Sequence, residues 1–167
     1  SHARAVIIGG GVVGCSIAYH LGKLGWRDVV LLERKQLTCG TTWHAAGLIA
    51  QLRATQNMTR LAKYSQELYF GLEAETGVAT GFKRNGSITV ALTDERMEEL
   101  RRSAAMARAF GVEIDEISPS DIASRYPGLS VDDAVGGVWL PKDGQADPVN
   151  ITPVSYTHLT LPTNRCV

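Results

Sequence analysis

The pattern of hydrophobic and polar positions near the start of the chain predicts a strand, a helix and a second strand. Residues 6–8 form a short, wholly apolar run with β-branched members, as a strand buried in a parallel sheet requires. Apolar residues recur at helical spacing over 12–24, and Gly25 is a suitable helix-ending residue. A second apolar run at 29–32 completes a βαβ pattern, which predicts two parallel strands joined by a crossover helix.

Helical and strand patterns alternate again after a stretch without periodicity at residues 34–50. The predicted elements are a helix over 58–75, a strand over 87–92, a helix between Thr93 and Gly111, a strand over 113–117, a short helix opened by Ser118-Pro119 and ended by Pro127-Gly128, and a strand over 135–140. Residues 141–148 are expected to form a loop. This order predicts an α/β fold, in which an α+β portion is inserted into a Rossmann-like βαβ unit.

The apolar side chains of the helix over 58–75 have a regular spacing of three and four. They are Leu61, Tyr64, Leu68 and Leu72. We expect this stripe to face a hydrophobic core rather than a ligand.

Three glycines between the first strand and the first helix have the spacing of a dinucleotide-binding motif. Gly9 would permit the tight turn, Gly11 would let a pyrophosphate approach the backbone, and Gly14 would let the helix pack closely on the strand. The helix N-terminus offers N–H groups to the phosphates. Glu33 at the end of the second strand is placed to accept a hydrogen bond from a ribose hydroxyl. The motif, strand, helix and acid together predict nucleotide binding.

Composition and charge exclude several classes of function. The 17 Lys and Arg residues balance 17 Asp and Glu residues, which leaves a net charge of +0 and no basic surface to favour nucleic acid. No apolar stretch approaches the roughly 20 residues that span a bilayer. The 3 cysteines are odd in number and lack a C-x-x-C pair, which favours a reducing compartment. Residues 1–4 lead directly into the first strand, which fits a bacterial cytoplasmic protein or a mitochondrial matrix protein whose presequence has been trimmed.

The loop at residues 34–50 is rich in Gly, Thr and Ala and contains the pair Trp43-His44. Small residues can lie flat against a planar ligand, and their hydroxyl and N–H groups can bind phosphate or ring edges. This loop is therefore the second candidate for contact with a cofactor.

Several blocks together resemble the N-terminal part of the sarcosine and dimethylglycine dehydrogenases, which are FAD-dependent members of the D-amino-acid-oxidase-like superfamily. The similarity extends over about residues 5–152. Its most specific block is Gly40-Thr41-Thr42-Trp43-His44-Ala45-Ala46-Gly47. The other blocks are residues 5–14, Leu32-Glu33-Arg34, Leu37-Thr38, Thr76-Gly77, Asn85-Gly86-Ser87, Asp143-Gly144 and Asp147-Pro148.

The resemblance implies FAD as the cofactor. The positions that match the cofactor site of the family are Gly9, Gly11, Val12, Val13, Gly14, Glu33, Arg34, Gly40, Thr41, Thr42, Trp43, His44, Ala45, Ala46, Gly47 and Leu48. By this comparison residues 9–14 hold the pyrophosphate, Glu33 holds the adenosine ribose, and residues 40–48 line the flavin. His44 matches the covalent attachment point, where an imidazole nitrogen bonds the 8α-methyl carbon of the flavin; a free imidazole beside a noncovalent flavin is the alternative.

The resemblance also implies a reaction, namely oxidation of the N-methyl C–N bond of sarcosine, dimethylglycine or a related methylated amino acid. The resulting iminium would yield formaldehyde or, in a full-length parent, pass its carbon to tetrahydrofolate. The electrons would pass to an acceptor such as an electron-transfer flavoprotein or oxygen. Arg53 is a candidate partner for the substrate carboxylate, but a solvated surface arginine is the simpler interpretation. We assign no catalytic residue and no metal ligand.

The resemblance divides the chain into three parts. Residues 1–50 form the N-terminal part of an FAD-binding domain, 51–152 contribute helices and strands to the FAD and substrate domains, and 153–167 form a non-native-looking tail. The tail has prolines where the family has a helix, lacks an apolar stripe, and resembles translated sequencing-adapter sequence. His158 and Cys166 would then have no function. We expect a truncated chain that is inactive and marginally folded alone.

Two other functions remain open at this point. One is a noncatalytic regulatory relative of the same family, such as the regulatory subunit of pyruvate dehydrogenase phosphatase, and the presence of His44 favours the enzyme over it. The other is an NAD-linked Rossmann dehydrogenase, for which the glycines and Glu33 would serve equally well. The long Thr/Gly/Ala loop after Glu33 disfavours the second alternative, because such folds usually proceed directly to another helix.

Overall fold

The computed structural model describes residues 2–157, which form two compact units. Unit 1 comprises residues 2–48, 67–82 and 146–157, and unit 2 comprises residues 49–66 and 83–145. The elements in chain order are β1 (Ala5–Ile8), α1 (Val12–Lys23), β2 (Val29–Leu32), the 3-10 helix η1 (Thr42–His44), β3 (Leu48–Ile49), α2 (Gln56–Thr76), β4 (Ser87–Ala91), α3 (Asp94–Ala109), β5 (Asp115–Ile117), α4 (Pro119–Arg125), β6 (Gly136–Leu140), β7 (Gly144–Gln145) and α5 (Pro148–Thr157). The predicted alternation of helices and strands is therefore confirmed, except that the predicted loop at 141–148 contains the short strand β7.

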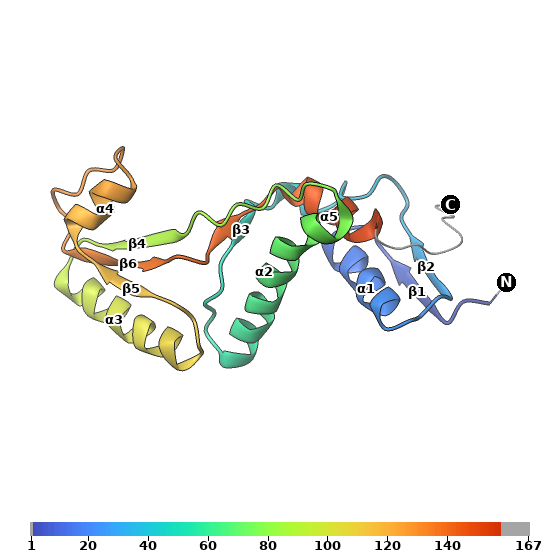
Figure 1. Cartoon of the computed structure of the whole chain (residues 1–167), viewed down its shortest axis with the longest axis horizontal. Helices are drawn as coiled ribbons and strands as arrows, with labels where there is room; N and C mark the ends of the chain where they lie inside the picture. The colour runs from blue at the N-terminus through green and yellow to red at the C-terminus, as the bar shows by residue number, and fades with distance from the viewer. Residues whose placement is uncertain (1, 158–167) are drawn as a thin grey trace. The chain divides into compact units, whose positions relative to one another are not determined.

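Unit 1 contains the predicted βαβ motif. Strands β1 and β2 pair in parallel, with Ala5 opposite Val29 and Ile8 opposite Leu32. Helix α1 lies along this pair (Figure 1) and closes a small core with it. The core consists of Ile7, Cys15, Ala18, Val29 and Leu31. A second cluster of Tyr19, Leu72 and Val154 joins α1 to α2 and α5.

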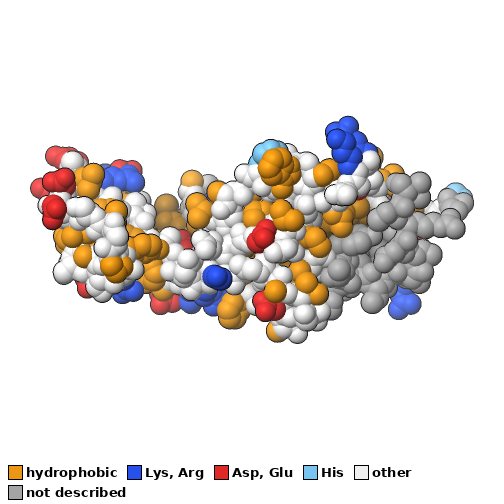
Figure 2. All heavy atoms as spheres, turned by 90° about the horizontal axis from the view of Figure 1, so that it is seen from above, with side chains coloured by type: hydrophobic (Ala, Val, Ile, Leu, Met, Phe, Trp, Pro, Cys, Tyr) orange, Lys and Arg blue, Asp and Glu red, His pale blue; other side chains and the backbone are white. Residues whose placement is uncertain are grey.

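The two strands are buried on one face only, so the prediction of complete burial is wrong. Ile7 and Leu31 are buried under α1, whereas the alternate side chains of Val6 and Ile8 are 56% and 86% exposed. The reason is the strand period of two: a single helix covers every second side chain and leaves the others open. Apolar side chains also occur among polar ones over the surface that Figure 2 shows.

Unit 2 is built on an antiparallel sheet with the order β4-β6-β5. Helix α3 packs on this sheet (Figure 1), and the residues that it buries are Met97, Leu100, Ala104 and Ala107. The core is formed by Ala91, Met97, Leu100, Ala104, Ala107, Val112, Ile114, Val138 and Leu140. Helices α3 and α4 each begin with a side-chain cap. The Thr93 hydroxyl accepts from Arg96 N, and Ser118 and Asp121 form a capping box at α4.

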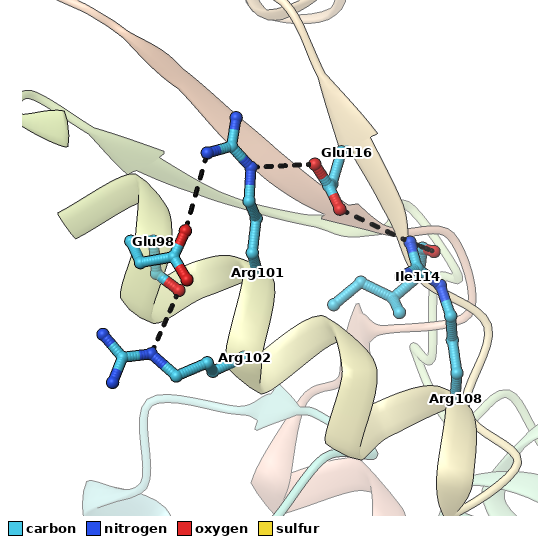
Figure 3. A network of polar contacts seen from close by, with 6 residues as sticks. All are labelled: Glu98, Arg101, Arg102, Arg108, Ile114 and Glu116. Carbon is cyan, nitrogen blue, oxygen red and sulfur yellow. Dashed lines mark hydrogen bonds and ion pairs between the residues drawn. The ribbon is translucent and has the colours of Figure 1, made fainter. Parts of the chain in front are cut away.

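The outer face of α3 is tied to β5 by exposed ion pairs (Figure 3). Arg101 reaches Glu98 at 3.7 Å and Glu116 at 3.3 Å, and Arg108 approaches Glu116 at 3.9 Å. Because these side chains are about half exposed, we expect each pair to contribute well under about 1 kcal/mol to stability.

Helix α2 differs from its predicted packing. It begins in unit 2 and ends in unit 1, and Leu61 and Tyr64 are 58% and 48% exposed rather than in a core. The buried positions of this helix include Thr59, Gln66 and Leu72. The prediction is wrong for Leu61 and Tyr64 because the polar side chains of Thr59 and Gln66 take the buried side of this part of the helix, where they bond to Arg53 N and Gln51.

The C-terminal helix α5 also corrects an expectation. It continues through Pro153 to Thr157, whereas the sequence predicts that proline prevents a helix there. Ile151 and Val154 are 3% and 1% exposed, so burial of these side chains outweighs the hydrogen bond that Pro153 cannot make. The rest of the predicted tail, including His158 and Cys166, lies outside the described residues, and its assignment stays a prediction. Among residues 2–157 no helix is long and apolar enough to cross a membrane.

Candidate cofactor site

The glycine turn between β1 and α1 has the geometry that the motif predicts. Gly9 has a φ of +110°, a conformation that side-chain-bearing residues rarely adopt, and its N–H donates to the Leu32 carbonyl at 2.8 Å. A Cβ added to Gly14 would lie 1.9 Å from the Gly9 carbonyl oxygen. Only glycine at position 14 therefore lets α1 pack this closely on the turn.

The carboxylate of Glu33 is held against the same turn. Its Oε2 accepts from Gly10 N at 2.7 Å, and its Oε1 accepts from Lys35 N at 3.0 Å. These backbone N–H groups, with that of Gly10 the larger cause, lower the pKa of Glu33. The carboxylate is thus ionised at neutral pH and keeps acceptor capacity for a ribose hydroxyl.

The loop after β2 is tied to the turn at two further points. Thr38 N donates to the Gly10 carbonyl at 3.0 Å, and Thr38 has a φ of +70°. Val12 N at the start of α1 donates to Thr42 Oγ1 at 3.1 Å. The loop that sequence reasoning singled out therefore packs directly on the glycine motif.

A cavity of about 840 Å³ lies along β1, the turn and α1. Ten of the sixteen predicted cofactor positions line it, and they are Gly9, Gly11, Val12, Val13, Gly14, Glu33, Gly40, Thr41, Thr42 and Ala45. Ile17 and Leu21 also line it, in addition to the positions predicted to contact the cofactor. Their spacing from Val13 along α1 was the signal for an apolar wall.

The other predicted positions do not line this cavity. They are Arg34, Trp43, His44, Ala46, Gly47 and Leu48. The rings of Trp43 and His44 lie against each other, with centroids 3.7 Å apart at an angle of 33°, and both residues are exposed. Gly47 has a packing role, because an added Cβ would lie 2.2 Å from the Ala146 carbonyl oxygen.

Arg53 has the features of a surface residue. Its side chain is exposed and its Nη1 donates to the neighbouring Leu52 carbonyl at 3.0 Å. Its backbone N–H is held by the buried hydroxyl of Thr59 at 3.1 Å. The simpler interpretation from sequence, a solvated arginine, agrees with this environment.

The residues around the cavity fit a dinucleotide. A Cβ at Gly9 or Gly40 would meet no atom within 4 Å, so the backbone is open to close approach of a ligand. The first turn of α1 presents its N–H groups beside this opening, where a phosphate would complement the helix dipole. The volume is within the range of about 300–1,000 Å³ typical of small-molecule sites.

Comparison with known proteins agrees with this geometry. The family description "FAD dependent oxidoreductase" (DAO) matches residues 4–156. The chain belongs to this family. The resemblance inferred from sequence and the α/β fold with a Rossmann-like motif are confirmed.

Relatives and solved structures of the DAO family align with nearly the whole chain. The chain is 43% identical over 149 residues to mouse mitochondrial sarcosine dehydrogenase, covering 89% of this chain and 16% of the relative. It is 44% identical over 150 residues to rat mitochondrial dimethylglycine dehydrogenase, covering 90% of this chain and 18% of the relative. It is 40% identical over 151 residues to the mouse mitochondrial pyruvate dehydrogenase phosphatase regulatory subunit, covering 90% of this chain and 17% of the relative. The chain thus spans about a sixth of the length of these relatives.

Among solved structures, L-proline dehydrogenase from P. horikoshii has a TM-score of 0.87 and 29% identity. The similarity covers 94% of this chain and 41% of that chain. The two units described here therefore correspond to structure that occurs within a longer DAO-family enzyme.

Proposed function

We propose that this chain is the cofactor-binding part of an FAD-dependent oxidoreductase that oxidises the N-methyl C–N bond of sarcosine, dimethylglycine or a related methylated amino acid. The observation that carries the proposal is the convergence of the glycine turn, Glu33 and the loop residues Gly40, Thr41, Thr42 and Ala45 around one cavity. Family membership and the names of the similar proteins support the type of reaction.

The residues of this chain would bind and orient FAD. FAD, when bound, supplies the acceptor for the hydride that leaves the N-methyl carbon. The N–H groups at the start of α1 would bind its pyrophosphate, and Glu33 would accept from its ribose. We assign its covalent attachment to His44, whose ring is accessible beside Trp43. An attached flavin keeps a fixed position relative to the substrate, which lowers the entropic cost of orienting the two.

Other parts of the proposal concern the whole protein. Its product iminium would give formaldehyde or pass one carbon to tetrahydrofolate, and its electrons would pass to an electron-transfer flavoprotein or to oxygen. The compartment would be a mitochondrial matrix or the cytoplasm of a bacterium; several of the similar proteins are named as mitochondrial. The 167-residue chain alone would be inactive, because it spans about a sixth of the similar dehydrogenases. Amine-dependent dye reduction by the purified chain would contradict that expectation.

A noncatalytic regulatory function is the second candidate. The 40% identity to a phosphatase regulatory subunit supports it, because that relative aligns with almost the same part of this chain as the dehydrogenases do. An NAD-linked dehydrogenase is disfavoured by membership of an FAD-dependent family. The decisive difference between the first two candidates is whether His44 carries a flavin.

The test is the fluorescence of the denatured full-length protein, produced with FAD, together with its intact mass. We expect flavin to stay on the denatured wild-type chain and on a His20→Ala control, whose substitution is in α1, and to be absent from denatured His44→Ala. Flavin released from all three proteins would contradict attachment but leave a noncovalent oxidase. No flavin in any of them would favour the regulatory function.

A further inference from the structure

The turn before β4 contains the pair Asn85-Gly86, and no other asparagine of the sequence is followed by glycine. In such a pair the backbone nitrogen of the glycine can attack the side-chain carbonyl carbon of the asparagine, because glycine has no side chain that hinders the approach. Asn85 is exposed, so water can reach it. The pair is therefore a candidate site for modification without an enzyme.

Two contacts hold Gly86 in the folded chain. Its N–H donates to the Asp143 carbonyl at 2.7 Å. Its φ is +74°, and a Cβ added to it would lie 1.7 Å from Cη2 of Trp139, so the indole ring lies directly on the glycine. Gly86 is buried, although the neighbouring Asn85 is exposed. The nitrogen that would attack is thus occupied and shielded, whereas the side chain that it would attack belongs to an exposed residue.

Both contacts are themselves held by neighbours within unit 2. The Asp143 carboxylate accepts from Gln51 N at 2.9 Å and from Ser87 Oγ at 2.7 Å, which fixes the segment that carries the Asp143 carbonyl. The guanidinium of Arg125 lies 4.7 Å from the centre of the Trp139 ring. These contacts oppose opening of the turn, but a local opening costs less free energy than unfolding of the whole chain.

We propose that Asn85 is a deamidation site that the folded turn keeps closed and that a local opening of the turn makes reactive. In the reaction the Gly86 nitrogen gives up its proton to a solvent base and bonds to Cγ of Asn85, while the bond from Cγ to the side-chain nitrogen breaks and ammonia leaves. Water then opens the resulting succinimide ring to aspartate or isoaspartate, so no oxidant or reductant is needed. The closed turn prevents the first step, because the Gly86 N–H is bonded to a carbonyl oxygen, which can only accept a hydrogen bond and would repel a deprotonated nitrogen.

The isoaspartate product prevents the turn from closing again. It adds one carbon to the backbone between residues 85 and 86 and replaces a neutral amide by a carboxylate. Gly86 then cannot keep both its hydrogen bond to Asp143 and its place against Trp139, because the close contact leaves no room for a displaced backbone. The modification therefore marks those molecules in which the turn has opened. This inference concerns unit 2 alone and does not depend on the proposed cofactor site.

The experiment measures deamidation of the folded 167-residue chain at mildly alkaline pH by peptide mapping with mass spectrometry. An unstructured peptide of residues 82–90 in the same buffer is the reference. We expect Asn85 to react in the peptide and to react at least about tenfold more slowly in the folded chain, because opening of the turn breaks a buried hydrogen bond. Equal rates would overturn the claim that the fold closes the site, and an unreactive peptide would overturn the assignment of Asn85 as a site.

Two substitutions separate local from global opening. Trp139→Ala removes the ring that covers Gly86, whereas Leu100→Ala removes a side chain from the core between α3 and the sheet. With both variants folded, Trp139→Ala should accelerate deamidation of Asn85, and Leu100→Ala should leave the rate near that of the wild type. Equal acceleration by the two variants would show that the reaction follows general destabilisation of unit 2 and would overturn the inference, as would an unchanged rate in Trp139→Ala.

Hydrogen exchange of the wild type covers the case in which Trp139→Ala does not fold. The Gly86 amide should exchange more slowly in the folded chain than in the peptide, because exchange and deamidation need the same opening. Exchange of this amide at the rate of the peptide would overturn the inference.

Discussion

Glu33 and Gly10 are joined by a hydrogen bond of 2.7 Å from the backbone N–H of the glycine turn to a carboxylate oxygen at the end of β2. Through this contact the acid fixes the turn before any ribose is bound. The same contact lowers the pKa of Glu33, so it makes the stability of the turn depend on pH.

The first prediction concerns this pH dependence. Because the folded-state pKa of Glu33 is below its ordinary value of 4.5, its contribution is present above pH 4.5 and is lost as the pH falls through the folded pKa. Urea unfolding at a series of pH values should show that the stability difference between wild type and Glu33→Gln declines with acidification in this range. The other carboxylates titrate alike in both proteins, so their contributions cancel in the difference between the two free energies of unfolding. A difference that stayed constant from neutral pH to pH 3 would contradict the prediction.

The second prediction concerns Gly14. Substitution by Ala would place Cβ 1.9 Å from the Gly9 carbonyl, so α1 must move away from the turn at a cost of about 1–3 kcal/mol of stability. ADP binding should fall with it. Gly40→Ala is the control, since its Cβ would meet no atom within 4 Å. Similar midpoints of thermal unfolding for Gly14→Ala and Gly40→Ala would show that the close approach of residue 14 to the Gly9 carbonyl is unimportant for stability.

The third prediction concerns the buried carboxylate of Asp143 in unit 2. One oxygen accepts from Gln51 N at 2.9 Å and the other from Ser87 Oγ at 2.7 Å, and the residue is 3% exposed. Asp143→Asn replaces one acceptor oxygen by an NH₂ group, which then faces the donor of Gln51 or Ser87. We expect the free energy of unfolding, measured by chemical denaturation, to fall by about 1–3 kcal/mol. Asp133→Asn, at an exposed position, should change stability by less than about 0.5 kcal/mol. Equal effects of the two substitutions would exclude this role for Asp143.

The fourth prediction concerns thiol reactivity. Burial, assisted by the charge of Glu33, raises the pKa of Cys15 to about 11, whereas Cys39 is exposed. Iodoacetamide at pH 8 should therefore modify Cys39 in the folded chain and leave Cys15 unmodified until denaturant is added, because the thiolate is the reactive species. Peptide mass mapping after a short reaction distinguishes the two sites. Modification of Cys15 at the rate of Cys39 would show that α1 opens readily.

Sequence reasoning succeeded where the physical cause is local. Thr93 and Ser118 could be recognised as helix caps because a cap and the N–H groups that it binds lie within one turn. Gly9 and Gly14 could be recognised because the strand-turn-helix path itself demands glycine there. The βαβ unit, the helix α3 and much of the cavity lining follow from such short-range requirements.

The tertiary structure decided everything that depends on residues distant in sequence. Leu61 has the spacing of a core position, but the buried contacts of its helix include Gln66, which bonds to Gln51. Thr42 contacts Val12 across 30 residues, and Asp143 contacts Gln51 across 92. Periodicity records which side of a helix or strand is apolar; it contains no information on which segment packs there. Sequence alone thus determined the nucleotide-binding motif and its family, and only the tertiary contacts determined which hydroxyl meets the N-terminus of α1.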